Sequence, residues 1–200
     1  MSRHKIAIVV GSLRKGSVNR RIALSIQSFA STTLECEIVE IGDLPLYNQD
    51  LDGEPPAAYV RFREAIAAAE GVLFVTPEYN RGVPGALKNA IDVGSRPYGA
   101  SVWDKKPAAI VSASPGGIGG FGANHQLRQL CVFLNMPTMQ QPEAYLGNVT
   151  DDKFDADGCL KEGPLKDVVV RIADAFAGWV GLILRGRAVI AEDEAHSAPA

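Results

Sequence analysis

Residues 5–19 read KIAIVVGSLRKGSVN, and this stretch decides the fold class. Its first six residues, 5–10, are almost all apolar and rich in β-branched side chains, which is typical of a parallel strand covered on both faces. A turn rich in glycine and serine follows, and residues 19–30 then carry apolar side chains at helical spacing. A buried strand that passes through such a turn into a helix predicts the first unit of an α/β sheet.

The same alternation continues along the chain. Further apolar runs predict strands at 34–41, 71–76 and 107–113, and a fifth at 138–141 or 144–146. Stretches of helical period between and after them predict helices at 57–69, 85–93, 124–134 and 165–184. Five strands alternating with helices predict a doubly wound five-stranded parallel sheet with helices on both faces. In such a sheet a ligand binds outside the carboxyl ends of the strands, at the switch point in strand order.

Length and composition restrict the function. The 200 residues fit one domain, expected over 1–190, followed by a polar and flexible tail over 191–200. A formal net charge of −3 argues against a nucleic-acid-binding protein. No apolar run approaches the roughly 20 residues of a membrane span, and no signal peptide is recognisable. With three scattered cysteines and no paired histidines, the sequence predicts no disulfide framework, no metal site and a cytoplasmic location.

The loop after the first strand is suited to a phosphate. Ser12, Ser17 and Asn19 offer hydrogen-bonding side chains, Arg14 offers a charge-assisted contact, and a helix N-terminus follows directly. Helix capping explains Ser17 or Asn19 taken singly, but it does not explain the whole cluster. A nucleotide-triphosphate loop is excluded because its lysine follows the second glycine, whereas here Lys15 precedes it.

The loop after the fourth strand carries the spacing G-x-G-x-x-G at Gly117, Gly119 and Gly122, with Glu143 about twenty residues further on. This spacing matches a dinucleotide-binding fingerprint. Too little chain follows it to build the second half of a dinucleotide fold, and the first strand lacks the fingerprint. A planar ring that approaches the glycine backbone closely accounts for the same residues.

The loop after the third strand, PEYNRG at 77–82, helps to choose among ligands. Backbone N–H groups and the Asn80 amide can bind the edge of a heteroaromatic ring, and Tyr79 can line the face of that ring. Pro77 and Asn80 are also ordinary turn formers. That role leaves Glu78 and Tyr79 unexplained.

Three segments resemble, in their order and spacing, the NADPH-dependent FMN reductase family, and within it the quinone and chromate reductase branch: GSLRKGSVN at 11–19, TPEYNRGVPGALKNAID at 76–92 and SASPGGIGG at 112–120. The resemblance implies a flavodoxin-like fold, tightly bound FMN and NADPH or NADH as electron donor. It also implies a homodimer or homotetramer, with the helix at 85–93 and the apolar stretch at 83–91 in the interface. The resemblance also assigns the contacts to FMN by position. The phosphate is expected to contact Ser12, Leu13, Arg14, Ser17, Val18 and Asn19. The isoalloxazine and ribityl parts are expected to contact Pro77, Glu78, Tyr79, Asn80 and Arg81, and the other edge of the ring is expected to contact Ser114, Gly116 and Gly117.

The implied activity is hydride transfer from NAD(P)H to FMN, followed by electron transfer to a quinone, chromate, an azo or nitro compound, or free flavin. One set of ring-binding loops predicts that donor and acceptor visit the same flavin face in turn. No catalytic side chain is expected, and Glu78 is expected to stabilise the turn or an interface. Tyr79, together with Tyr98 or Trp103, is expected to border the acceptor pocket. The alternatives are a flavodoxin-type electron carrier without its own NAD(P)H oxidation and a nonflavin binding or scaffold protein of this fold.

Overall fold

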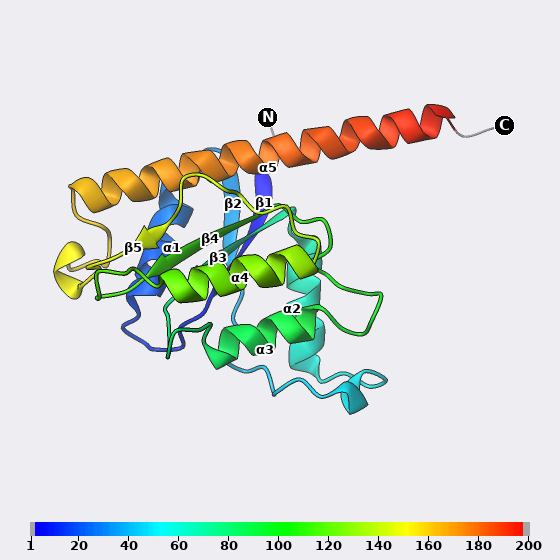
Figure 1. Ribbon diagram of the computed structural model, residues 1–200, viewed down its shortest axis with the longest axis horizontal. Helices are drawn as coiled ribbons and strands as arrows, with labels where there is room; N and C mark the ends of the chain where they lie inside the picture. The colour runs from blue at the N-terminus through cyan, green and yellow to red at the C-terminus, as the bar shows by residue number, and fades with distance from the viewer. Residues whose placement is uncertain (1–2, 198–200) are drawn as a thin grey trace.

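Five parallel strands alternate with five long helices within residues 3–197, the part of the chain that the computed structural model describes (Figure 1). The strands are β1 (His4–Val10), β2 (Leu34–Ile38), β3 (Gly71–Thr76), β4 (Ala108–Ala113) and β5 (Tyr145–Leu146). The helices are α1 (Val18–Phe29), α2 (Ala57–Ala68), α3 (Gly85–Gly94), α4 (Phe121–Phe133) and α5 (Pro164–Ser197). Two short 3₁₀ turns, η1 (Gln49–Leu51) and η2 (Asp151–Lys153), lie in the connections.

The strands form one sheet in the order β2-β1-β3-β4-β5, and every neighbouring pair is parallel. The chain starts at β1, adds β2 on one side, and then returns past β1 to build β3, β4 and β5 on the other side. The direction of strand addition therefore reverses between β1 and β3, which is the switch point of the sheet. The order and the parallel pairing confirm the predicted doubly wound, flavodoxin-like fold.

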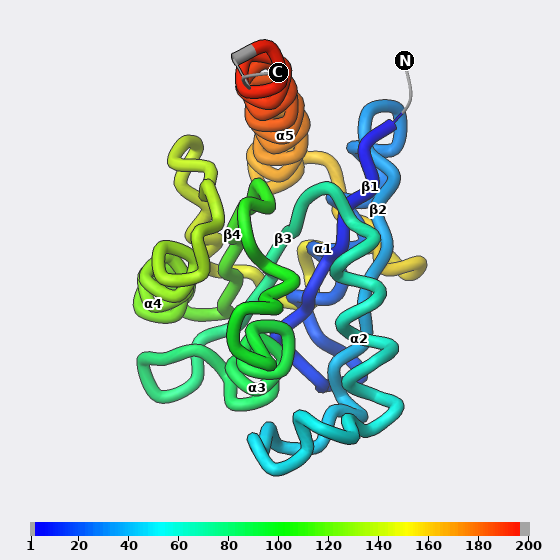
Figure 2. Tube along the Cα trace, turned by 90° about the vertical axis from the view of Figure 1, so that its right-hand side faces the viewer, coloured from blue at the N-terminus to red at the C-terminus, as the bar shows by residue number. Residues whose placement is uncertain are grey.

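Alternating side chains of the central strands build two hydrophobic cores, one on each face of the sheet. All six residues of β3 are buried. Leu73 and Val75 belong to the core shared with α1 and α5, whereas Val72 and Phe74 belong to the core shared with α2, α3 and α4. Successive side chains of a strand point to opposite faces, so one continuous apolar run supplies both cores. Figure 2 shows α5 on one side of the sheet and α2 and α3 on the other.

Two predicted strands differ in extent from the observed ones. The sequence predicts a strand over 34–41, whereas β2 ends at Ile38. Both segments considered for the fifth strand contact β4, because Tyr145–Leu146 pairs with it as β5 and Thr138 forms a single bridge to Ala108. Prolines near these segments cannot donate to a ladder, which limits the pairing to short pieces.

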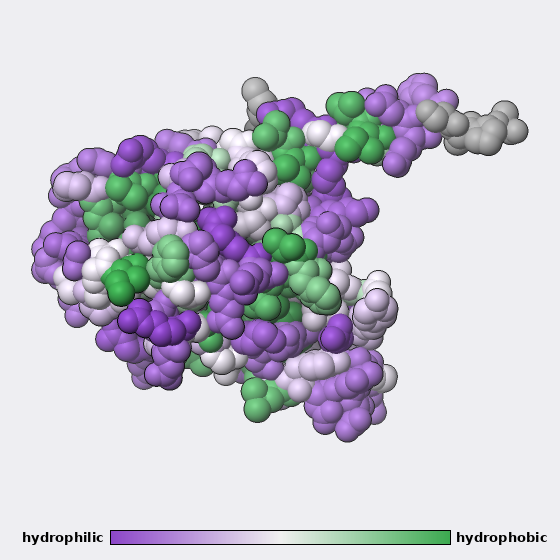
Figure 3. Space-filling view, in the orientation of Figure 1, coloured by the Kyte–Doolittle hydropathy of each residue, from purple (hydrophilic) through white to green (hydrophobic). Residues whose placement is uncertain are grey.

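Helix α5 is longer than the sequence predicts. Its apolar periodicity ends at Leu184, but the helix continues to Ser197, so residues 191–197 of the predicted tail are helical and 198–200 lie outside the described residues. The 34 residues of α5 correspond to a length of about 51 Å. The C-terminal part projects beyond the sheet in Figure 1 and beyond the body of the molecule in Figure 3. Despite this length, neither α5 nor another helix of the described chain is apolar enough to cross a lipid bilayer.

Candidate flavin site

Loops that follow β1, β3 and β4 meet at the carboxyl edge of the sheet, beside the switch point. Gly11, directly after β1, donates its N–H to the carbonyl of Val75 in β3 (2.8 Å). Asn19, in the first turn of α1, donates its Nδ2 to the carbonyl of Ala113, the last residue of β4 (3.1 Å). The loops that the sequence singles out are therefore neighbours in space, as a parallel sheet requires.

The loop after β1 ends in a helix terminus that can bind an anion. Ser17 caps α1, and its Oγ accepts a hydrogen bond from the N–H of Arg20 (3.3 Å). The N–H groups of Val18 and Asn19 have no helical carbonyl one turn earlier, because the helix begins there. Free N–H groups and the helix dipole together favour a bound phosphate.

A cavity of about 540 Å³ adjoins this loop and carries positive charge. Its lining includes Ser12, Leu13, Arg14, Lys15, Arg20 and Glu40. Arg20 is engaged in an ion pair with Glu40 (Nη2–Oε1, 2.6 Å). Arg14 and Lys15 lie in the loop itself, line the same cavity and are exposed.

The side-chain oxygen of Asn19, in the first turn of α1, is a buried acceptor without a donor among the described residues. The residue is 2% exposed, and its Oδ1 is buried without a hydrogen-bond partner among the described residues. A buried acceptor without a donor costs about 1–3 kcal/mol. A hydroxyl of the FMN ribityl chain, next to the phosphate, is a donor of the right kind. The chain therefore fits FMN at the position that the phosphate loop indicates.

The segment after β3 forms a tight turn at the rim of the site. Tyr79 and Gly82 exchange two backbone hydrogen bonds of 3.0 Å each. Asn80 and Arg81 between them have left-handed backbone angles, with φ values of 51° and 65°. Two consecutive left-handed residues are the signature of the tightest hairpin turns. Half-buried Pro77 directly follows β3 and starts this segment, whose tip exposes Tyr79 and Asn80.

Glu78 joins this turn to α4. Its carboxylate accepts a hydrogen bond from the N–H of Ala123 through Oε2 (3.0 Å) and one from Nη1 of Arg81 through Oε1 (3.3 Å). A negative charge at a helix N-terminus is favourable. A Cβ atom at Gly122 would lie 2.8 Å from Oε2, so glycine is needed for this approach. Glu78 is a positioning residue that holds the loops after β3 and β4 together.

The glycine-rich loop after β4 packs against the loop after β5. The N–H of Ser114 donates to the last carbonyl of β5 (3.0 Å), and its Oγ accepts from the N–H of Gly116 (3.1 Å). Asn148 donates its N–H to the carbonyl of Gly116 (3.3 Å). A Cβ atom at Gly147 would lie 2.4 Å from the carbonyl oxygen of Gly117. The glycines thus permit backbone-to-backbone packing, a reason that the fingerprint spacing does not reveal.

Sequence reasoning missed the contribution of Gly147 and Asn148. A Gly-Asn pair directly after a strand is a turn signal, and Asn148 has a left-handed φ of 55°. Its recognition depends on identifying β5, which has only two residues.

The aromatic residues around the site differ in part from the expected ones. Trp103 is 0% exposed within the core formed with α2, α3 and β3, so its prediction as a wall of the acceptor pocket is wrong. Tyr98 follows α3, whose ten residues lead about 15 Å away from the turn. Tyr79 stays at the rim and is 52% exposed. Phe121, directly after the glycine-rich loop, is an exposed aromatic residue that the sequence did not single out, and its ring lies tilted against that of His125 with centroids 4.1 Å apart.

A switch-point site with a phosphate-binding helix terminus, a polar turn and a glycine-rich loop defines a flavodoxin-like flavin protein. Known proteins agree with this class. The sequence model for NADPH-dependent FMN reductase matches residues 4–151. The chain belongs to the NADPH-dependent FMN reductase family.

Relatives match nearly the whole chain. A quinone reductase of Pseudomonas putida is 57% identical over 180 residues, which cover 90% of this chain and 96% of that protein. A 2-hydroxy-1,4-benzoquinone reductase of a Burkholderia species is 44% identical over 88% of this chain and 96% of its own length. Among solved structures, FerB of Paracoccus denitrificans, a flavoenzyme NAD(P)H:(acceptor) oxidoreductase, has a TM-score of 0.85 at 38% identity, covering 89% of this chain and 97% of that one.

Proposed function

We propose that this FMN-dependent NAD(P)H oxidoreductase passes its electrons to quinones. The observation that carries the proposal is the meeting of the loops after β1, β3 and β4 at the switch point, beside a helix terminus suited to a phosphate. Two relatives are named as reductases of quinones, and their identity of 57% and 44% over most of the chain supports this acceptor class. Chromate, azo and nitro compounds and free flavin are the competing acceptors.

The residues of the chain bind and orient the cofactor, and FMN, when bound, supplies the hydride and electron chemistry. The N-terminus of α1 and Arg14 hold the phosphate, with Ser12 and Ser17 beside it. Asn19 accepts a hydrogen bond from the ribityl chain. Tyr79 restricts the approach of nicotinamide and acceptor to the open face of the ring.

The Glu78 carboxylate and two of the cysteines have surroundings that do not favour a role in proton transfer or thiol chemistry. Both carboxylate oxygens of Glu78 already accept hydrogen bonds. Burial raises the pKa of the Cys36 and Cys131 thiols to about 11, so both stay protonated at neutral pH. Within the described residues, no group of three His, Cys, Asp or Glu side chains is placed to hold a metal ion.

Steady-state kinetics are expected to show a ping-pong pattern. Because nicotinamide and quinone use the same face, the oxidised nucleotide must leave before the quinone can bind. Double-reciprocal plots of NADPH oxidation at several quinone concentrations should give parallel lines. Intersecting lines would reveal a ternary complex and a second pocket, and absence of NADPH oxidation would favour the flavodoxin-type carrier.

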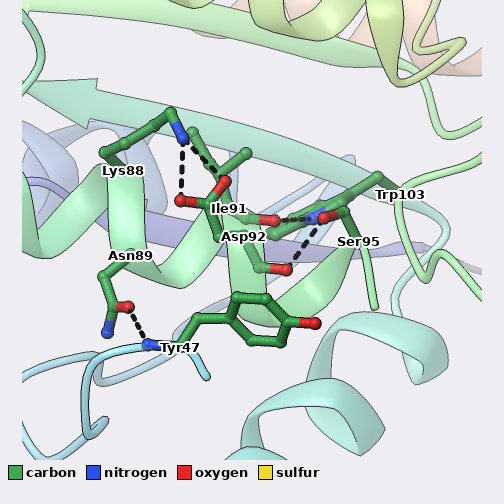
Figure 4. Close-up of polar contacts among 7 residues, drawn as sticks. All are labelled: Tyr47, Lys88, Asn89, Ile91, Asp92, Ser95 and Trp103. Carbon is green, nitrogen blue, oxygen red and sulfur yellow. Dashed lines mark hydrogen bonds and ion pairs between the residues drawn. The ribbon is translucent and has the colours of Figure 1, made fainter. Parts of the chain in front are cut away.

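We propose that the protein forms at least a dimer. Within the apolar stretch at 83–91, Leu87, Ala90 and Ile91 are 0%, 0% and 3% exposed and face the sheet, so the apolar surface that this stretch offers to a partner is limited to Val83, Gly85 and Ala86. Figure 4 shows the polar side of α3, where Nζ of Lys88 lies 2.7 Å from the Asp92 carboxylate. Exposed apolar residues gather at the end of α4 and on α5, including Val132, Phe133, Leu182, Val189 and Ile190.

Light scattering of the purified protein is expected to give at least twice the chain mass of 21.3 kDa at micromolar concentration. A mass of one chain across the concentration range would contradict the dimer. In this proposal residues 1–190 act as one flavin-binding domain in the cytoplasm. The three unpaired cysteines support that reducing compartment.

A further inference from the structure

The projecting end of α5 has no cover from the rest of the chain. The last buried residues of the helix are Val180 and Gly181, and all residues from Arg185 to His196 are exposed. Ile190, in the middle of this projection, is 59% exposed. Helices of about 12 residues are marginal in water, because most helical stability in proteins comes from the packing of an apolar face. The projection shows apolar patches to solvent in Figure 3.

A groove of about 600 Å³ separates the projection from the end of α4. Its helical wall consists of Ile183, Arg187, Ile190, Ala191 and Glu194. These residues are separated by one, three or four positions along the helix, so they share one face of α5. That face is the continuation of the stripe by which α5 packs on the sheet.

Two residues of opposite charge flank the apolar centre of this face at equal distances along the helix. Arg187 lies one turn before Ile190 and Ala191, and Glu194 lies one turn after them. Nη1 of Arg187 donates to the carbonyl of Lys105 (3.1 Å), and neither Arg187 nor Glu194 forms an ion pair with another residue in the described chain. Antiparallel packing of two such faces about a two-fold axis at Ile190 and Ala191 brings each arginine opposite the glutamate of the other copy. A self-complementary patch of this kind is what a two-fold interface requires.

The wall of the groove on the body side suits the same occupant. Val132, at the end of α4, is 78% exposed, and Met136 and Pro137 continue the apolar surface. Lys105 adds a positive charge to this wall. Glu194 of a second helix complements that charge.

We propose that two copies of this chain pair through the C-terminal end of α5. The helices run antiparallel, and each enters the groove of the other copy between α5 and α4. Ile190 and Ala191 form the centre of the contact, and two reciprocal ion pairs between Arg187 and Glu194 of the partner subunit fix the register. This pairing is independent of the flavin chemistry.

Single charge reversals test the pairing. Arg187→Glu makes the face wholly acidic and Glu194→Arg makes it wholly basic, so each variant alone places like charges opposite each other. Sedimentation equilibrium at low salt is expected to show a dissociation constant raised roughly tenfold or more for each variant, because repulsion replaces attraction at two contacts. An equimolar mixture of the two variants restores opposite charges and should return to the wild-type mass. The double variant R187E/E194R should also pair like the wild type.

Matched controls lie on the opposite face of the same helix. Arg185 and Glu192 each sit two residues from Arg187 and Glu194, which is about 200° around the helix. Arg185→Glu and Glu192→Arg should leave the mass unchanged, and all variants should oxidise NADPH like the wild type. An assembled wild type whose mass neither reversal lowers, or reversals that the mixture does not rescue, would overturn the α5 pairing and leave the dimer proposal standing. A monomeric wild type would overturn both.

Discussion

FMN is expected to bind at least about a hundredfold more tightly than riboflavin, which lacks only the phosphate. In the proposed complex the phosphate accepts hydrogen bonds from the N–H groups of Val18 and Asn19 and from Arg14. Each hydrogen bond to a charged group contributes about 1.5–3 kcal/mol. Two of them give roughly 3 kcal/mol or more, hence a factor of about 100 or more in affinity. Titration of the apoprotein, followed by quenching of flavin fluorescence, measures the ratio for riboflavin, FMN and FAD.

The variant Arg14→Ala identifies the contact responsible. It should weaken FMN binding by about tenfold or more and leave the weak binding of riboflavin unchanged, because only the phosphate loses a partner. Arg3→Ala is the matched control. Arg3 precedes β1, and its Nη1 donates to the carbonyl of Ser31 (2.9 Å). The control substitution therefore removes the same charge at the opposite edge of the sheet. Equal affinities for FMN and riboflavin in the wild-type protein would show that the phosphate does not bind at the α1 terminus.

Trp103→Ala is expected to lower the free energy of unfolding by about 3–5 kcal/mol, the usual cost of truncating a buried aromatic residue. The indole lies against Phe62 and Phe74, with ring centroids 5.9 and 5.7 Å away. Its Nε1 donates to the carbonyl of Ile91 in α3 (3.0 Å; Figure 4). Truncation therefore leaves a cavity and an unpaired carbonyl together. Urea denaturation of the apoprotein measures the change without the stabilisation that bound FMN adds.

Tyr98→Ala is the control for that experiment. Tyr98 belongs to the same connection after α3 but is 91% exposed, so its truncation should change stability by no more than about 0.5 kcal/mol. Trp103→Phe should lower the free energy of unfolding by an amount between those of Trp103→Ala and Tyr98→Ala, because phenylalanine keeps much of the side-chain volume but loses the hydrogen bond. A loss below about 1 kcal/mol for Trp103→Ala would mean that the core closes over the gap.

The strands and the place of the site could be predicted because both depend on local pattern. An apolar run such as GVLFVT at 71–76 is buried wherever a parallel sheet places it. The carboxyl ends of those strands then locate the loops. The burial of Trp103, by contrast, could not be predicted from its neighbours in sequence, because it depends on Phe62 and Phe74 from other elements.

Helix α3 and helix α5 show two further limits of the sequence pattern. The apolar residues of α3 recur at helical spacing, and in a layered α/β fold that stripe packs on the sheet, so it is not available to a partner. In α5 the apolar stripe weakens after Leu184, while alanine, arginine and glutamate continue to favour the helix. The periodicity of apolar residues predicts the part of a helix that packs on the rest of the protein. The helix propensity of the residues predicts how far the helix extends beyond that part.

Beside the candidate flavin site, the loops after β4 and β5 pack backbone against backbone. Gly117 contacts Gly147, and the Glu78 carboxylate reaches α4 only because Gly122 has no side chain. Engineering of a new acceptor preference is therefore restricted to the rim, where Tyr79 and Phe121 are exposed. Libraries randomised at these two positions should retain folded, flavin-loaded members, whereas a library randomised at Gly147, where a Cβ atom would lie 2.4 Å from the carbonyl oxygen of Gly117, should lose the yellow colour of bound flavin in most clones.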